Sequence, residues 1–362
     1  MADNKDKKVL NVPHLRFPEF TEEWKRKRFK DVCNITTGNK NTQDKSDDGI
    51  YPFYVRSQIV ERINSWTFDG EAILTAGDGV GVGKVFHYST GKIGVHQRVY
   101  ILSDFKCDGK YLYSYFAGNF YNRVKRMSAK NSVDSVRMEM IADMPISLPS
   151  NEEQKKIGHL LALLDERIAT QNKIIEKLQS LIKGLRVRLI QIENGNIVHL
   201  GEIAQIYQPQ TISSTELTED GFLVYGANGI IGKYIEYNHK TEQICITCRG
   251  NTCGMVNYTK PMSWITGNAM VINTDAHQDK VCKRYLYHYL SAYNFNRIIS
   301  GSGQPQIVRT PLEQLKVTLP TISEQKQKAL FLDKIQDKID LNHKVLNLNI
   351  RQKQYLLRQM FI

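Results

Sequence analysis

The glycine-rich stretch GDGVGVGK, which ends at Lys84, is the first place where the sequence offers chemistry, because such stretches can bind phosphate. A nucleotide-binding phosphate loop needs glycine where this chain has Asp78, and serine or threonine where it has Val85. The glycine spacing also differs from that of dinucleotide-binding loops. The sequence therefore predicts a glycine-rich turn between two strands at this place.

Three cysteines, Cys245, Cys248 and Cys253, have the spacing C-x2-C-x4-C, which suggests zinc. A structural zinc site takes four ligands, and no clear fourth ligand lies nearby. The chain starts with a charged segment rather than an apolar signal peptide, and no apolar run approaches the ~20 residues of a membrane span. We therefore expect no metal site, reduced thiols, no membrane contact and a cytoplasmic protein.

No catalytic constellation is visible in the sequence. His87, His96 and His239 lack a neighbouring nucleophile or carboxylate pattern, so we expect them to be structural histidines. The chain has no two adjacent prolines, which excludes the Asn/Asp-Pro-Pro-Tyr/Phe motif typical of amino-methyltransferases that act on DNA. We expect no catalytic residue and no cofactor in this chain.

The charge balance favours a polyanionic partner. The chain has 49 Lys and Arg against 37 Asp and Glu, a net charge of +12. Such an excess suits nucleic acid, although charge alone does not distinguish nucleic-acid-binding proteins from other basic proteins.

Polar loop residues are the candidates for contacting DNA, because Arg, Asn, Gln, Ser and Asp side chains can read base edges. In the first half of the chain the candidates are Arg56, Ser57, Gln58, Asp78, Lys84, Asn131 and Asp134. In the second half they are Asn228, Arg249, Asn251, Ser302, Gln304 and Gln306. The basic residues expected to touch phosphate or solvent are those at 25–28, Arg123, Lys125 and Arg126. For any one residue, ordinary divergence of a loop is the alternative.

An internal repeat shows which elements must position these loops. PSNEEQKKI begins at Pro149 and returns as PTISEQKQK at Pro320, 171 positions later. At the same offset Gly79 meets Gly250 and Gly83 meets Gly254. Ordered matches of this kind identify residues 29–190 and 200–361 as two copies of one unit. The loops are where the copies differ most, as expected of two similar scaffolds that recognise different ligands.

Each copy ends in a predicted long helix. Ser150 and Glu153 have capping-box spacing, as do Thr321 and Glu324. Apolar residues then follow in steps of three and four, which is typical of a coiled-coil seam. We expect the two helices to pack against each other in antiparallel orientation.

One polar residue, Gln171, interrupts the first seam near its middle, and Asn342 is its counterpart in the second helix. The second seam is less regular, because Asn349 and Lys353 occupy positions where apolar residues are expected. Gln171 and Asn342 are 171 positions apart. We predict that they face each other and fix the register of the coil. Two unrelated, solvated amides are the alternative.

The predicted fold class is α+β, with two α+β domains related by a pseudo-two-fold axis and separated by an antiparallel coiled coil of two long helices. The predicted regions are 1–148 (first domain), 149–192 (first helical region), 193–319 (second domain) and 320–362 (second helical region).

The opening VPHLRFPEFTEEWKRKRFKDV is similar to the start of many specificity subunits of type I restriction-modification systems. The two LP…EQ helix segments resemble the two conserved helical regions of that family. The resemblance covers nearly the whole chain.

The resemblance implies a non-catalytic subunit in which 1–148 and 193–319 are target-recognition domains, and each recognition domain reads one half of a split double-stranded DNA target. It implies that the helix pair sets the spacer and docks two methylation subunits, which use S-adenosylmethionine to methylate adenine N6. It also implies two restriction subunits that use ATP and Mg to translocate and cleave DNA.

Three other readings remain open at this point. The first is an inactive or exchange-partner specificity subunit. The second is a coiled-coil scaffold without DNA readout, and the third is a nuclease with an unfamiliar site.

Overall fold

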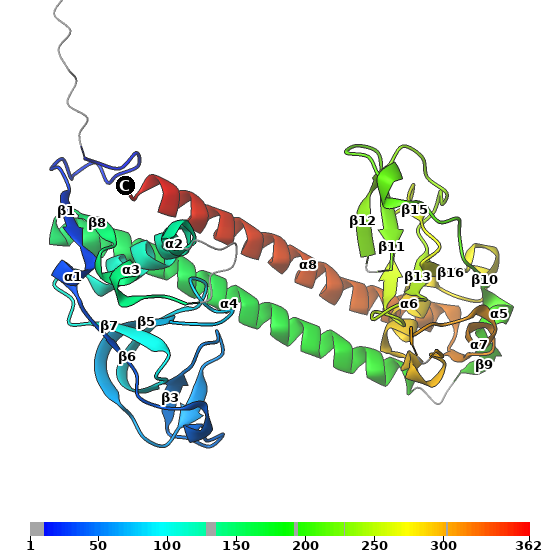
Figure 1. Ribbon diagram of the computed structural model, residues 1–362. Helices are drawn as coiled ribbons and strands as arrows, with labels where there is room; N and C mark the ends of the chain where they lie inside the picture. Colours follow the sequence, from blue (N-terminus) through cyan, green and yellow to red (C-terminus); the bar gives the residue numbers. More distant parts are fainter. Residues whose placement is uncertain (1–10, 128–134, 192–194, 228, 302) are drawn as a thin grey trace, which may run out of the picture. The chain divides into compact units, whose positions relative to one another are not determined.

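The chain folds into two compact units. The computed structural model (Figure 1) describes residues 11–127, 135–191, 195–227, 229–301 and 303–362. Unit 1 comprises residues 1–171 and 345–362, and unit 2 comprises residues 172–344. Both long helices cross the boundary, so each unit contains one part of each helix. Within the described part of the chain, no helix is long and apolar enough to cross a membrane.

Unit 1 combines one large sheet with a separate strand pair. Its strands are β1 (Lys25–Arg28), β2 (Asn34–Thr37), β3 (Tyr51–Tyr54), β4 (Glu61–Ile63), β5 (Phe68–Ala76), β6 (Phe86–Val95), β7 (Val99–Ser103) and β8 (Pro145–Leu148). Its short helices are α1 (Phe29–Val32), η1 (Thr42–Asp44), α2 (Gly109–Met127) and α3 (Met138–Ala142). The large sheet has the order β2-β7-β5-β6-β3-β4, and β1 pairs with β8.

Unit 2 has three smaller sheets. Its strands are β9 (Asn196–His199), β10 (Gln205–Tyr207), β11 (Phe222–Gly226), β12 (Gly229–Tyr234), β13 (Ile244–Thr247), β14 (Val256–Tyr258), β15 (Trp264–Ile265), β16 (Ala269–Asn273) and β17 (Lys316–Leu319). Its short helices are α5 (Leu200–Ile203), η2 (Ser214–Glu216), η3 (Asp275–His277), α6 (Lys283–Ala292), η4 (Phe295–Arg297) and α7 (Arg309–Glu313). The sheet orders are β10-β16-β13-β14, β12-β11-β15 and β17-β9.

The internal repeat holds at the level of strand pairing. The order β2-β7-β5-β6 of unit 1 returns in unit 2 as β10-β16-β13-β14. Ile73 pairs with Leu102 in unit 1, and Ile244 pairs with Ile272 in unit 2, at offsets of 171 and 170 positions. The units differ beyond this shared part, because β3 and β4 extend the sheet of unit 1 while β11, β12 and β15 form a separate sheet. The predicted α+β class and duplication are confirmed.

An aromatic helix packs into the core of each unit. Tyr111 of α2 and Tyr285 of α6 are completely buried. The Tyr111 hydroxyl donates to the carbonyl of Ser147 at 2.6 Å, and the Tyr285 hydroxyl donates to the carbonyl of Thr318 at 3.1 Å. Burying a tyrosine requires such an acceptor for its hydroxyl. The helices α2 and α6 therefore fill equivalent places in the cores of the two units.

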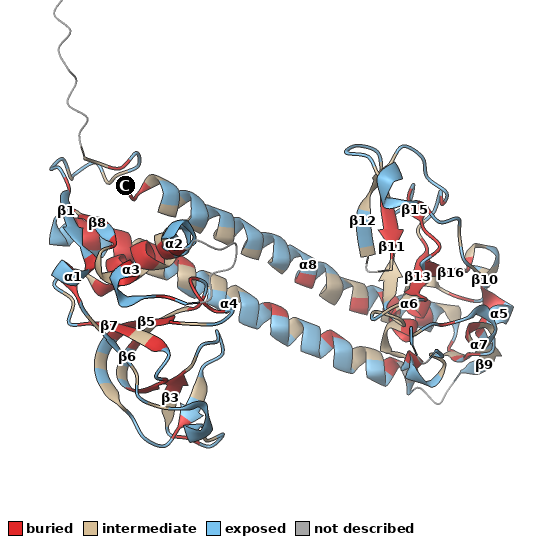
Figure 2. Ribbon diagram, in the orientation of Figure 1, coloured by how far each residue is buried: buried red, intermediate tan, exposed pale blue. Residues whose placement is uncertain are grey.

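The two long helices are α4 (Asn151–Ile190) and α8 (Ile322–Gln359). Buried or half-buried positions recur along both among exposed ones (Figure 2). Within unit 1, Asp165 of α4 pairs with Lys353 of α8. Within unit 2, Arg186 of α4 donates to Gln336 of α8 at 3.3 Å. Between these two contacts the residue number rises in α4, from 165 to 186, and falls in α8, from 353 to 336. The predicted antiparallel pair is therefore confirmed.

The two helix starts differ in how their carboxylates are used. At α8 the predicted capping box is complete: Glu324 N–H donates to Thr321 Oγ1 at 3.4 Å, and Thr321 N–H donates to Glu324 Oε2 at 3.0 Å. At α4, Glu153 N–H donates to Ser150 Oγ at 3.4 Å. The buried Glu153 carboxylate instead accepts two hydrogen bonds from Arg16, each 2.7 Å long. A buried ion pair thus replaces the second half of the expected box.

A polar network joins α4, α6 and α8 within unit 2. His288 of α6 is completely buried; its Nδ1 accepts from Arg186 Nε at 3.0 Å, and its Nε2 donates to Asp333 at 2.8 Å. Asp333 also accepts from Arg284 Nε at 2.9 Å. Since an arginine N–H can only donate, His288 Nδ1 has no proton and the ring is neutral. Burial lowers the pKa of His288, and the charge of Arg186 adds to this, while the hydrogen bond to Asp333 opposes it.

We expect unit 2 to lose stability as the pH falls below about 6.5, the ordinary histidine pKa. The pKa of His288 is lower in the folded chain, so the unfolded chain binds the proton first and is favoured at acid pH. Burial raises the pKa of Asp333, but hydrogen bonds from His288 and Arg284 outweigh it and lower that pKa, so its carboxylate stays charged. Hydrogen exchange of α6 amides at pH 7.5 and 5.5 measures the effect.

Arg186 of α4, Asp333 of α8 and Arg284 of α6 are the charged groups that face this histidine. Other histidines titrate too, so the comparison is with His288→Gln, in which the pH dependence should be smaller. Equal pH dependence in the two proteins would contradict the assignment.

Candidate nucleic-acid interface

Four loops of unit 1 are hydrogen-bonded to one another through their backbones. His96 N–H donates to Tyr54 O at 3.0 Å, Gly77 N–H donates to Arg98 O at 2.8 Å, and Val136 N–H donates to Gly77 O at 2.7 Å. We call this set of bonds the loop platform. It fixes the loop after β3, the turns before β6 and β7, and the segment before α3 relative to one another.

Unit 2 contains the same loop platform. Thr266 N–H donates to Tyr225 O at 3.0 Å, Cys248 N–H donates to Asn268 O at 3.1 Å, and Ile307 N–H donates to Cys248 O at 3.0 Å. Each residue lies 171 or 170 positions after its counterpart. The backbone support is therefore duplicated, while the side chains on it differ.

Glycines give the loop platform its turns. Gly79 and Gly83 have φ values of 76° and 67°, and their counterparts Gly250 and Gly254 have 85° and 90°. Only glycine adopts this left-handed region without strain. The turn of unit 1 lies between β5 and β6, so the glycine-rich turn predicted around Lys84 is confirmed.

Among the predicted residues of unit 1 that the structure describes, Arg56 is the one that contacts Asp78. The Oδ1 atom of Asp78 accepts from Arg56 Nη1 at 2.8 Å. The Ser57 hydroxyl donates a hydrogen bond to Ile59 O at 3.0 Å, and Gln58 is exposed. Lys84 is exposed and lies 5.7 Å from the ring centre of Tyr121.

The predicted residues of unit 2 lie on the equivalent loops. Arg249 forms an isolated bridge with Gln306, which matches the bridge between Asp78 and Ser135 at an offset of 171. Gly250 N–H donates to Pro305 O at 3.0 Å, which closes the loop onto the same segment. The exposed polar residues there are Arg249, Asn251, Gln304 and Gln306. Four predicted residues, Asn131, Asp134, Asn228 and Ser302, lie outside the described residues.

The basic residues expected to touch phosphate lie elsewhere in unit 1. All four residues of β1 are exposed, and Arg28 pairs with Asp143 at 3.1 Å. Arg123 Nε donates to Met140 O at 2.7 Å, whereas Lys125 and Arg126 are exposed.

Sequence reasoning missed Arg98 of the loop platform, and it named the neighbouring His96 only as a structural histidine. Arg98 is 64% exposed and forms an ion pair with Asp78 at 3.7 Å. His96 is buried, accepts from Arg98 N–H at 3.0 Å through Nδ1, and its Nε2 lies 3.3 Å from Thr42 Oγ1. Burial lowers the pKa of His96, as does the charge of Arg56. The run VHQR placed these side chains beside each other, but nothing in it indicated their partner on another loop.

The cysteines and the other histidines have structural surroundings. Burial raises the pKa of Cys245 to about 12 and also raises the pKa of Cys248 and Cys253. All described cysteines are free thiols, and no cluster of His, Cys, Asp or Glu among the described residues could hold a metal ion. His239 Nε2 lies 2.8 Å from the Tyr207 hydroxyl, and His87 donates to Ser57 O at 3.1 Å.

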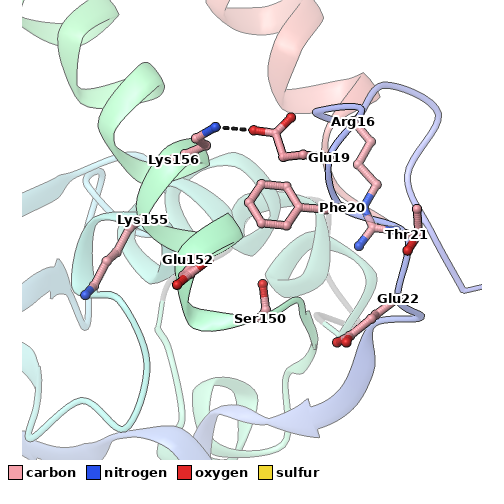
Figure 3. A pocket seen from close by; sticks show the side chains of 9 residues that line it. All are labelled: Arg16, Glu19, Phe20, Thr21, Glu22, Ser150, Glu152, Lys155 and Lys156. Atoms are coloured by element: carbon pink, nitrogen blue, oxygen red, sulfur yellow. Dashed lines mark hydrogen bonds and ion pairs between the residues drawn. The ribbon is translucent and has the colours of Figure 1, made fainter.

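A cleft of about 670 Å³ lies beside the start of α4 (Figure 3). Its lining residues are Arg16, Glu19, Phe20, Thr21, Glu22, Ser150, Glu152, Lys155 and Lys156. Lys156 pairs with Glu19 across it. None of the predicted DNA-binding residues lines this cleft, so it is separate from the loop platform.

Comparisons with known proteins assign a family. Residues 21–180 and 193–349 match the family described as "Type I restriction modification DNA specificity domain". The EcoDI specificity subunit of Escherichia coli is 28% identical over 164 residues, covering 45% of this chain and 36% of that protein. The MjaVIII specificity subunit of Methanocaldococcus jannaschii is 24% identical, covering 94% and 92%.

A solved structure shares the fold. The S subunit of a type I restriction-modification system from M. genitalium superposes with a TM-score of 0.76 at 18% identity, covering 97% of this chain and 99% of that one. The alignments with the E. coli EcoDI and EcoprrI specificity subunits are shorter. They span only 36% and 34% of the lengths of those two proteins.

Proposed function

Because the chain belongs to the type I restriction-modification DNA specificity family, we propose that it reads a split DNA target, one half-site with each unit. The resemblance noted in the sequence is confirmed at the level of the family, and membership agrees with the expected non-catalytic role without a cofactor of its own. Loops on the loop platform contact base edges, and basic surface residues contact phosphates.

The duplicated loop platform is the observation that carries this proposal. Two units with the same backbone support but different exposed side chains suit two readers of different sequences. An excess of positive charge supplies sequence-independent affinity that weakens with salt. Arg56, Ser57, Gln58, Asp78 and Lys84 are our candidates in unit 1, together with Asn131 and Asp134. The candidates in unit 2 are Asn228, Arg249, Asn251, Ser302, Gln304 and Gln306.

The partners proposed are two methylation subunits and two restriction subunits, which carry S-adenosylmethionine, ATP and Mg. The helix pair of α4 and α8 sets the spacer and docks the methylation subunits. Gln171 and Asn342 fix its register, and a pseudo-two-fold axis relates the recognition domains 1–148 and 193–319, with helical regions 149–192 and 320–362. Free thiols support a reducing, cytoplasmic location.

DNA binding by the assembled methylation complex tests the proposal. The chain is reconstituted with a methylation subunit from the same genome and mixed with a random DNA library at several salt concentrations. We expect selection of two fixed blocks separated by an unread spacer, and the logarithm of the binding constant should fall linearly with the logarithm of the salt concentration. A stable complex that selects no DNA would favour a scaffold or an inactive subunit. Cleavage or methylation by the chain alone would favour an enzyme.

A further inference from the structure

We propose that Arg56 and Arg98 act as an arginine pair that recognises guanine in the half-site of unit 1, and that Asp78 is a positioning residue. This inference rests on the proposed function and names the readers within it. It changes the expected role of Asp78, which was a candidate for direct DNA contact.

The two oxygens of Asp78 face different arginines. Oδ1 lies 2.8 Å from Arg56 Nη1, and Oδ2 lies 3.7 Å from Arg98 Nε. The Asp78 side chain is 26% exposed, against 47% for Arg56 and 64% for Arg98. The carboxylate therefore lies beneath the arginine pair, and the guanidinium groups are nearer to an incoming ligand.

The backbone holds these three residues in place. Arg98 O accepts from Gly77 N–H, next to Asp78, at 2.8 Å. A Cβ at Gly81 would lie 2.5 Å from Arg56 O, so only glycine permits the turn to approach Arg56 this closely. His96, which is neutral, receives Arg98 N–H and adds no charge. The arginine pair is thus supported from loops that are themselves fixed to one another.

This geometry suits guanine. An arginine recognises guanine by donating two hydrogen bonds to O6 and N7. Asp78 engages Nη1 of Arg56, which leaves the Nε–Nη2 edge to form such a pair. Without a carboxylate the two positive charges would repel each other, and each flexible side chain would lose more entropy on binding. Asp78 therefore lowers the cost of presenting both guanidinium groups together.

Unit 2 has different side chains at the equivalent positions of its loop platform. Arg249 occupies the position of Asp78, and Ala227 occupies that of Arg56. Arg249 alone carries the single net positive charge that the arginine pair and Asp78 carry together in unit 1. Equivalent positions on the two loop platforms therefore hold a positioning carboxylate in unit 1 and an exposed arginine in unit 2.

The test maps methylated adenine in cells that express the methylation subunit with the wild-type chain or one variant. Arg56→Ala and Arg98→Ala should each reduce discrimination against sites that lack a guanine of one half-site by roughly 5- to 140-fold, which corresponds to ~1–3 kcal/mol. Asp78→Asn should relax the same positions less, because the amide still accepts a hydrogen bond. The second half-site and the spacer should not change in any of them.

Two further variants separate base readout from charge and from folding. Arg98→Lys keeps the charge but replaces the planar fork of donors with one ammonium group, so it should weaken guanine discrimination, although less than Arg98→Ala does. Lys92→Ala, an exposed residue of the same unit, removes one charge and should leave all preferences unchanged. Where Arg98→Ala abolishes methylation, Arg98→Lys decides the question.

The outcomes are distinguishable. A split motif in the wild type with unchanged preferences in the arginine variants overturns this inference alone, as does guanine discrimination that Arg98→Lys retains in full. A half-site without guanine also overturns it. A wild-type complex that binds and methylates no sequence contradicts the proposed function, and this inference with it.

Discussion

Lengthening both long helices by one turn is expected to lengthen the unread spacer and leave the bases of both half-sites unchanged. Four residues are inserted after Lys173 in α4 and four after Lys344, its counterpart 171 positions later in α8. Each insertion adds about 6 Å of helix, which is roughly two base pairs of DNA. Methylation mapping of the variant complex measures the spacer directly.

The control is an equal insertion in a loop that is not part of the helices. Asp47 lies between β2 and β3 and its side chain is 94% exposed, so four residues after it should leave the spacer as it is. An insertion after Lys173 alone should disturb the antiparallel register rather than shift the spacing. A changed half-site at constant spacing would refute the role of the helix pair as a ruler.

Asp333→Ala is expected to destabilise unit 2 by about 2–3 kcal/mol. The carboxylate is the shared acceptor for Arg284 and His288, and its removal leaves a buried ring and a guanidinium without that partner. Breaking a fully buried ion pair costs ~3–5 kcal/mol, and we expect less here because Arg284 is 31% exposed. Urea unfolding, with hydrogen exchange of α6 to localise the loss, measures the effect.

Asp337→Ala provides the matched control, since Asp337 is exposed on the same helix one turn further on. It should change the free energy of unfolding by less than about 0.5 kcal/mol. Asp333→Asn should fall between the two, because the amide retains an acceptor. If Asp333→Ala unfolds at the same urea concentration as the wild type, the network does not stabilise unit 2.

Features that depend on local pattern were predictable from the sequence. The offset of 171 predicted two copies of one unit, and the shared strand order β2-β7-β5-β6 and β10-β16-β13-β14 agrees with it. The glycine matches had a conformational cause, since all four adopt positive φ. The steps of three and four likewise predicted that the two long helices pack against each other, and apolar positions such as Ile157 and Leu161 of α4 are buried.

Features that depend on distant contacts were not predictable. Glu153 satisfied a local capping rule, yet Arg16, 137 residues away, takes its carboxylate. Lys353 interrupts the apolar seam because Asp165 pairs with it on the facing helix. The sequence around Arg98 did not indicate its ion pair with Asp78, because Asp78 lies on another loop. One sequence cannot reveal such pairs, since they form only after strand pairing brings the loops together.

The central claim is that the chain reads a split DNA target. Its most direct test is a map of N6-methyladenine in a host that has no restriction-modification system and expresses this chain with its methylation subunit. The account predicts one split motif, modified on both strands, with a fixed spacer between two half-sites. A stable complex that produces no new methylation would contradict it and would favour a scaffold or an inactive subunit.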